Sequence, residues 1–378
     1  MGVQETGYAS YQSLIMGTTE EMNSKERLCE TIRRRPTDRV PVHFRAEPET
    51  LEKIYQRIGI RDYDRLLDYL DSDIRCVDAV YPPIKKCGEY YENCWGERHI
   101  FRPSQFGPVR EMIDGALTDV QSLDDFKKYP WPKIDDLDYS GVAAFCDRFS
   151  DRGIAYGWAD FSQRPSNARG MQNFLMDMSL HPEYVHYMTN YFTEFYVEDF
   201  RRAQRASGNR IDMFFSSTDL GTQSGPMISS KAFREFIKPY LKRLADAAHE
   251  VGAALFYHTC GMIEPFIEEI IEVGVDILDP IQPCNPKMQP EILQERFGGR
   301  ICFHGGIDVQ GILATGTPEQ VQQEVLRYEN AFKHQGYIVS SSHYLQMDTS
   351  VENMFAIFNK SVDGIMQDNS KVKKSILL

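Results

Sequence analysis

His258 and Cys260 stand one residue apart at the end of the apolar, strand-like run 254–257. Their side chains supply nitrogen and sulfur, the donor atoms that zinc prefers in proteins. Side chains two positions apart in a strand point the same way. The pair would therefore form half of a zinc site and would need one or two further ligands from elsewhere in the fold. A buried Cys more often acts as a small hydrophobic residue, so this interpretation requires other polar groups at the same place.

The elements that would position such a site follow a regular pattern. Eight short apolar or β-branched runs, most of them followed by a helical pattern, predict an α/β protein with a (β/α)8 TIM barrel. The predicted strands are 40–45, 73–78, 153–158, 212–217, 253–258, 275–279, 300–304 and 337–341. Helices are predicted over 230–251, 263–273 and 318–333, where apolar residues recur at helical spacing.

The alternation of strand and helix breaks between the second and third predicted strands. Residues 81–132 are aromatic, interrupted by Gly and Pro, and partly alternating, which predicts a β-hairpin insertion after the second strand. We expect residues 1–24 to form an N-terminal extension and residues 25–378 to form a single barrel domain that contains this insertion.

The composition sets bounds on the class of protein and its partners. The 378 residues are 42% hydrophobic and 26% charged, as in a large soluble globular protein. A net charge of -13 argues against nucleic acid or an anionic membrane as partner. The first 24 residues lack the apolar core of a signal peptide, and the eight Cys are scattered, so we expect a cytoplasmic protein with reduced thiols. The sequence leaves homo-oligomer formation open.

Polar residues gather after the predicted strands, at the carboxyl ends where barrels of this type carry their chemistry. They are His43, Arg45, Asp78, Trp158, Asp160, Thr218, Asp219, His258, Cys260, Asp279, Gln282, His304, Asp308, Ser342 and His343. His343 is the preferred third metal ligand because it directly follows the eighth run and offers a nitrogen donor. His304 is the second choice, and the carboxylates of Asp279 and Asp219 are further alternatives.

Several segments resemble the uroporphyrinogen decarboxylase superfamily, and the similarity extends from about Lys25 to Val362. They are Gly170-Met-Gln-Asn-Phe-Leu-Met-Asp177, His181-Pro-Glu183, Asp219-Leu-Gly-Thr-Gln223, the run from Phe233 to Arg243, His258-Thr-Cys-Gly261, Asp279-Pro-Ile-Gln-Pro283, the run from Phe303 to Gln310, and Glu352-Asn353. The resemblance implies the same barrel fold. It also implies one of two activities, because the superfamily contains tetrapyrrole decarboxylases and zinc-using, cobalamin-linked methyltransferases.

The methyltransferase branch fits the residues better. The decarboxylases bind propionates with an Arg-rich stretch near the first strand, whereas this chain offers Arg45 alone. The resemblance implies that His258 and Cys260 bind zinc together with a Cys after the last strand. In this chain His343 stands at about that position, which gives the site two imidazoles in place of an S-rich set.

These observations lead to the hypothesis of a zinc-dependent, corrinoid-linked methyltransferase of anaerobic one-carbon metabolism. It would move a methyl group between a corrinoid (cobalamin) protein and either a small methylated donor, such as a methoxylated aromatic compound in O-demethylation, or a thiol or folate acceptor. His258, Cys260 and His343 would hold the metal, and the candidate catalytic residues are Asp219, Asp160 and His43. The candidate substrate-binding residues are Arg45, Trp158, Phe215 and Asp78.

Two other functions stay open at this point. A divergent decarboxylase-like lyase would act on a tetrapyrrole without a cofactor and would place Arg45, Asp78 and His343 around a pyrrole ring. A barrel that binds a tetrapyrrole or corrinoid without turning it over would show ligand binding and no methyl transfer. The metal content distinguishes the first of these from the methyltransferase.

Overall fold

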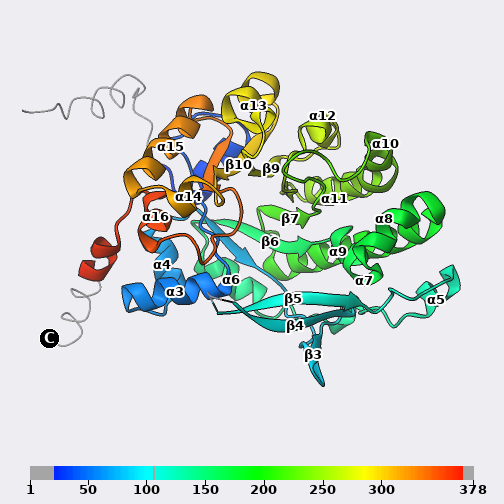
Figure 1. Ribbon diagram of the computed structural model, residues 1–378. Coiled ribbons are helices and arrows are strands. Elements are labelled where there is room, and N and C mark those ends of the chain that lie inside the picture. The colour runs from blue at the N-terminus through cyan, green and yellow to red at the C-terminus, as the bar shows by residue number, and fades with distance from the viewer. Residues whose placement is uncertain (1–20, 105–106, 369–378) are drawn as a thin grey trace, which may run out of the picture.

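The computed structural model describes residues 21–104 and 107–368. Most of the predicted N-terminal extension 1–24 falls outside these ranges. Within them, seven parallel strands form one sheet in the order β1-β6-β7-β8-β9-β10-β11 (Figure 1). Their bounds are β1 Ile74–Val77, β6 Gly153–Ala159, β7 Met213–Ser217, β8 Ala254–His258, β9 Ile277–Ile281, β10 Cys302–Ile307 and β11 Tyr337–Ser341. The sequence placed each of these strands to within three residues at either end.

Helices follow most of the strands. They are α2 Ser24–Ile32, α3 Pro48–Ile58, α4 Tyr63–Tyr69, α5 Leu123–Lys128, α6 Val142–Arg148, α7 Gln163–Arg169, α8 Met171–Leu180, α9 Pro182–Ser207, α10 Ser230–Ala232, α11 Lys238–Glu250, α12 Glu264–Glu272, α13 Pro290–Phe297, α14 Ile312–Thr315, α15 Pro318–Ala331 and α16 Val351–Ala356. Helices such as α9, α11 and α15 pack against the outer side of the sheet (Figure 1). No helix in the two described ranges is long and apolar enough to span a membrane.

The sheet curls until its first and last strands share one interior. A buried apolar cluster takes residues from every strand, together with Leu28 of α2. Its members are Leu28, Ile74, Ala155, Met213, Phe215, Phe256, Ile277, Cys302 and Ile338. The segment 40–46 bridges Val339 of β11 at Val42, and the Val42 oxygen accepts from the Asp73 N–H just before β1, so the segment lies between the two edge strands. The fold is therefore α/β and TIM-barrel-like.

The first predicted strand, 40–45, is not a regular strand. It makes only isolated parallel bridges to the β11 side, at Val42 with Val339 and at Ala46 with Leu345. On the β1 side, two backbone N–H groups that a ladder would use donate to side chains: Val42 to Asp73 Oδ2 at 2.8 Å and Phe44 to Ser72 Oγ at 3.3 Å. These side chains replace backbone partners, so the segment lies between β11 and β1 without a continuous ladder.

Between β1 and β6, the described residues form four antiparallel strands in the order β2-β3-β4-β5. Their bounds are β2 Lys85–Cys87, β3 Tyr90–Glu92, β4 Glu97–Ser104 and β5 Gly107–Gly115. β5 contacts α7, which follows β6, and Figure 1 shows this small sheet to one side of the parallel strands.

A cluster of side-chain hydrogen bonds ties this region to the main body. Asp199 of α9 is buried and accepts hydrogen bonds from three tyrosine hydroxyls: Tyr81 at 2.7 Å, Tyr139 at 2.8 Å and Tyr156 at 2.6 Å. Tyr156 lies in β6, whereas Tyr81 and Tyr139 come from segments on either side of the small sheet. The carboxylate thus joins three separate parts of the chain.

Candidate functional site

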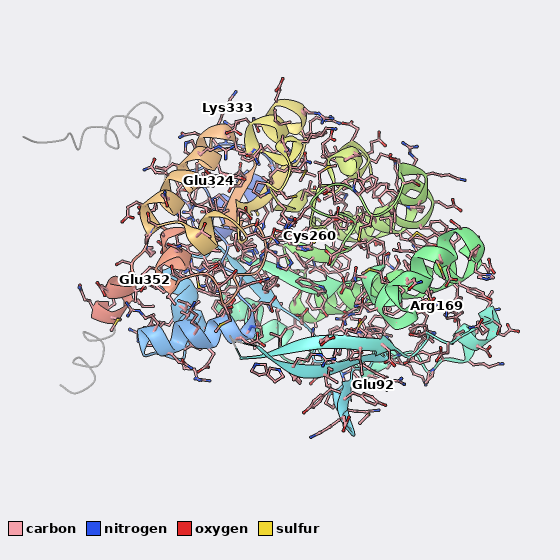
Figure 2. The ribbon with its side chains drawn as sticks, in the orientation of Figure 1. Glu92, Arg169, Cys260, Glu324, Lys333 and Glu352 are labelled. Carbon is pink, nitrogen blue, oxygen red and sulfur yellow. The ribbon has the colours of Figure 1, made fainter. Side chains whose placement is uncertain are left out.

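The ends of β8 and β11 bring a candidate metal site together. His258 is the last residue of β8, Cys260 follows it, and His343 follows β11. One nitrogen of each imidazole and the Cys260 sulfur lie within 4.8 Å of one another. Figure 2 shows Cys260 among the side chains near the centre of the fold. His258 is buried, whereas Cys260 and His343 are partly exposed, so part of the cluster is accessible to solvent.

Asp279 of β9 organises the buried side of this cluster. The register of the sheet places Asp279 directly opposite His258. Its carboxylate contacts His258 Nδ1 at 2.5 Å, His304 Nδ1 at 2.6 Å, and both terminal nitrogens of Arg45 at 2.6 and 2.7 Å. Burial opposes its ionisation, but the charge of Arg45 and the contacts with both His residues hold the pKa of Asp279 well below its ordinary value.

His304 and His43 continue the same network into the interior. His304 Nε2 lies 3.0 Å from His43 Nδ1, and His43 Nε2 lies 4.0 Å from the Cys76 sulfur. Burial lowers the pKa of His304 to about 4 and lowers the pKa of His43 well below its ordinary value. Because Asp279 and His43 engage both ring nitrogens of His304, this residue is not available to the cluster as the alternative third ligand.

Asp219, the residue two positions after β7, lies beside the thiol of the cluster. The Cys260 thiol donates to Asp219 Oδ1 at 3.1 Å. Burial raises the pKa of this thiol well above its ordinary value, and Asp219 raises it further. Without a cation nearby, Cys260 therefore stays protonated. Asp219 itself keeps 41% of its side chain exposed, so it faces both the thiol and solvent.

His343 contributes an unsatisfied nitrogen. Its Nδ1 is buried and has no hydrogen-bond partner among the described residues. Burial lowers the pKa of His343 to about 4, with His258 and Arg45 adding to the effect. The imidazole is thus neutral at ordinary pH and keeps a free lone pair, which is the form that binds metal ions.

Asp160, which follows β6, is buried next to Arg164. Burial raises the pKa of Asp160 to about 7, the charges of Glu97 and Asp219 add to the rise, and Arg164 opposes it. Its Oδ1 has no hydrogen-bond partner within the described part of the chain. Asp160 can therefore gain or lose a proton near neutral pH, and it senses the charge of Asp219.

Aromatic side chains lie beside His258. The rings of Trp158 and Phe215 lie 4.8 Å apart, and their centroids are 5.9 and 6.3 Å from that of His258. Tyr344, which the sequence did not single out, lies 5.8 Å from Trp158, with the Arg45 guanidinium over its ring at 5.2 Å. These contacts give the site an aromatic wall.

Asp78 lies apart from this group. Its side chain is exposed to solvent, but protein atoms surround the carboxyl closely. The resulting desolvation, together with the charge of Asp199, raises the pKa of this carboxyl to about 6. No hydrogen bond in the described ranges joins Asp78 to the cluster. Among the described residues, Arg45 connects to the cluster through Asp279 and His43 through His304, and no hydrogen bond joins either of them to His258, Cys260 or His343.

The sequence predicts Asp279 only as an alternative metal ligand and does not predict its contacts with Arg45, His258 and His304. Its four side-chain contacts come from three residues in other parts of the chain, and nothing in the spacing of these residues reveals that they meet. The available signal was its place at a predicted strand end, in Asp279-Pro-Ile-Gln-Pro283.

A family model described as Uroporphyrinogen decarboxylase (URO-D) matches residues 165–362, more than half of the chain. No match was found among curated proteins. Among solved structures, a methyltransferase from Methanosarcina mazei has a TM-score of 0.64 at 14% identity, over 93% of this chain and 100% of that chain. At that identity the likeness shows a shared fold. A structure of L-ribulose 3-epimerase has a TM-score of 0.41 at 11% identity, over 90% and 97% of the two chains, and supports no argument.

The matched residues include β7 to β11 and with them His258, Cys260, Asp279 and His343. On this evidence, the chain belongs to the uroporphyrinogen decarboxylase (URO-D) family.

Proposed function

We propose that this protein is a zinc-dependent methyltransferase that exchanges a methyl group with a corrinoid protein. The observation that carries the proposal is the cluster of His258, Cys260 and His343, whose ligand atoms lie within 4.8 Å of one another. The shared fold with a methyltransferase supports it. We also infer that the small antiparallel sheet is an insertion into the barrel, as expected for 81–132.

The donor set fits zinc on chemical grounds. Two imidazoles and one thiol are typical zinc ligands, and three protein ligands with one open position are typical of catalytic sites. The buried Nδ1 of His343, which has no hydrogen-bond partner among the described residues, is a further sign that the site is built for an additional group. A zinc ion held there would supply Lewis-acid chemistry and would keep a coordinated thiol ionised near neutral pH.

The surrounding residues have distinct roles in this proposal. Asp219 would take the proton that Cys260 releases, because the thiol already donates to it. Asp160 would hold or move a proton near the substrate, in keeping with its raised pKa of about 7. His43 and Arg45 would act through His304 and Asp279, whereas Asp78 would bind substrate only if the substrate extends toward β1.

The aromatic wall suits an apolar methyl donor. Trp158 and Phe215 would contact a small methylated compound, such as a methoxylated aromatic, beside His258. If the methyl group instead moves from the corrinoid protein to a small molecule, the acceptor would be a thiol or a folate. The corrinoid partner follows from the resemblance noted for the sequence, and it would dock over the carboxyl ends of the strands.

The lyase alternative has less support. A tetrapyrrole with many carboxylates needs free guanidinium groups, because each desolvated carboxylate requires a strong partner. The candidate for this role, Arg45, is buried, and both of its terminal nitrogens are already engaged by Asp279.

Elemental analysis of the purified protein tests the proposal, with Cys260→Ser as the variant and Cys94→Ser as its matched control. Cys94 is also partly buried but lies outside the cluster. We expect near-stoichiometric zinc in the wild type and in Cys94→Ser. Cys260→Ser should lose both the zinc and the transfer of methyl groups from methylated donors to a corrinoid protein. Zinc and activity retained in Cys260→Ser would refute the assignment. A zinc-free protein that releases CO₂ from a porphyrinogen would establish the lyase instead.

A further inference from the structure

The contacts of Asp279 form a symmetric arrangement that fixes which atoms donate and which accept. Oδ2 contacts Arg45 Nη1 at 2.6 Å and His258 Nδ1 at 2.5 Å. Oδ1 contacts Arg45 Nη2 at 2.7 Å and His304 Nδ1 at 2.6 Å. Each oxygen thus faces one guanidinium nitrogen and one imidazole Nδ1. Asp279 and His304 have no exposed surface, and Arg45 and His258 are almost fully buried, so water does not compete for these bonds.

This geometry determines the tautomers of both imidazoles. A guanidinium only donates hydrogen bonds, and a carboxylate that is paired with it through both oxygens only accepts them. The contacts with His258 and His304 are therefore hydrogen bonds only if each Nδ1 carries the proton. In a neutral imidazole the other nitrogen, Nε2, then keeps its lone pair.

The direction of the hydrogen bonds continues beyond His304. Its Nε2 must accept, so His43 Nδ1 donates across the 3.0 Å contact. His43 Nε2 is then left to accept from the Cys76 thiol at 4.0 Å. Every partner from Cys76 to Asp279 has one consistent role, and no donor faces another donor.

At the other end, His258 Nε2 has no hydrogen-bond partner among the described residues. It lies 3.7 Å from Asp219 Oδ1, which is too long for a hydrogen bond. The lone pair of this nitrogen is available to the cluster with Cys260 and His343.

We propose that Asp279 is a positioning residue that, held by Arg45, locks His258 in the Nδ1–H tautomer and directs its Nε2 lone pair to the metal cluster before an ion binds. His304 and His43 extend the same chain of hydrogen bonds on the buried side of Asp279. The proposal rests on the proposed function for the identity of the cluster as a metal site, but its tautomers exist in the metal-free protein. Carboxylate partners of this kind commonly orient imidazole ligands and strengthen metal binding.

Long-range ¹H–¹⁵N spectra of the metal-free, full-length protein with ¹⁵N-labelled His test the lock directly. Single His→Gln variants assign the signals. We expect His258, His304 and His43 each to carry a proton at Nδ1. A wild-type His258 protonated at Nε2, or one that exchanges between tautomers, would overturn the proposal without any information from metal or activity.

Asp279→Asn is the matched perturbation, because it keeps the shape of the side chain but gives it a donor group that must face Arg45 or an imidazole. We expect His258 or His304 to change tautomer and zinc affinity to fall about 10- to 100-fold. Unchanged tautomers and unchanged affinity would contradict the proposal. If this variant does not fold, Arg45→Lys, which removes the two-point pairing that holds Asp279, replaces it in the same measurements.

Asp276→Asn is the control, since Asp276 lies just before the same strand and pairs with His249 at 2.8 Å on the surface. It should alter the His249 signals and leave zinc affinity unchanged. These measurements distinguish a failure of this inference from a failure of the proposed function. Locked tautomers and tight zinc binding without methyl transfer would leave the inference intact and refute the function, whereas methyl transfer with unlocked tautomers would do the opposite.

Discussion

His258 and His343 meet edge to face, with ring centroids 5.6 Å apart, although they lie at the carboxyl ends of strands that are not neighbours in the sheet. β9 and β10 lie between β8 and β11. The contact therefore exists because the sheet curls, which brings the carboxyl ends of separated strands over one axis. A site that spans β8 and β11 depends on the whole barrel rather than on a single loop.

His343→Ala should remove a ligand and weaken zinc binding by at least about 100-fold, because even the loss of outer-shell partners costs about 10- to 100-fold. His343→Cys should still bind zinc, since thiolate is an equally suitable donor. Competition with a chromophoric chelator measures both affinities. The control is His181→Ala, where about half of the side chain is exposed between α8 and α9. Wild-type affinity in His343→Ala would exclude this residue as a ligand.

Gly221→Ala should disturb the cluster through the backbone. A Cβ at Gly221 would lie 2.5 Å from the Cys260 carbonyl oxygen and 2.9 Å from the Gly261 carbonyl carbon, so the two loops must separate. We expect reduced zinc content and a loss of stability of roughly 1–3 kcal/mol. Gly141→Ala, where a Cβ would meet nothing within 4 Å, is the control. Full zinc content in Gly221→Ala would show that the cluster tolerates movement of this loop.

Asp199→Ala should destabilise the fold, because three tyrosine hydroxyls lose their buried acceptor. We expect a loss of roughly 2–4 kcal/mol in the free energy of unfolding, and about 1–2 kcal/mol for Tyr139→Phe. Urea denaturation provides the measurement. Asp135→Ala removes an exposed partner of Arg202 and should change stability by less than about 0.5 kcal/mol. Equal effects of the two Asp variants would argue against a structural role for the tyrosine cluster.

Glu329 should make stability depend on pH. It lines a cavity of about 420 Å³ between α15, α16 and the segment 39–42, and burial raises the pKa of its carboxyl from 4.5 to about 7. Between these pH values the folded protein binds more protons than the unfolded chain, so this contribution to stability is lost as pH rises. Allowing for partial solvent access, Glu329→Gln should be more stable than the wild type by about 1–2 kcal/mol at pH 8.

Urea denaturation at pH 5 and pH 8 checks this prediction, and the difference between the proteins should be smaller at pH 5. Glu352→Gln serves as the control, because Glu352 is exposed and paired with Arg57. A stabilisation that is equal at both pH values would point to a cause other than the titration of Glu329.

The fold could be predicted in large part because its signals are local. Short apolar runs that end in polar residues located β1 and β6 to β11, and helix caps and apolar periodicity located helices such as α12 and α15. The closing segment 40–46 was the exception. Its sequence is apolar enough for a strand, but the side chains of Asp73 and Ser72 take the hydrogen bonds of a ladder.

The sequence by itself determined the residue types that the chemistry needs: the His258 and Cys260 pair at one strand end, and His343 after the last strand. It did so because side-chain direction in a strand and the location of strand ends follow from neighbouring residues. Only the tertiary structure decided that His343 rather than His304 joins the pair, and that Arg45 and His304 converge on Asp279. Those relationships depend on the register between strands and on the curl of the sheet, which are set by packing over the whole barrel rather than by local sequence.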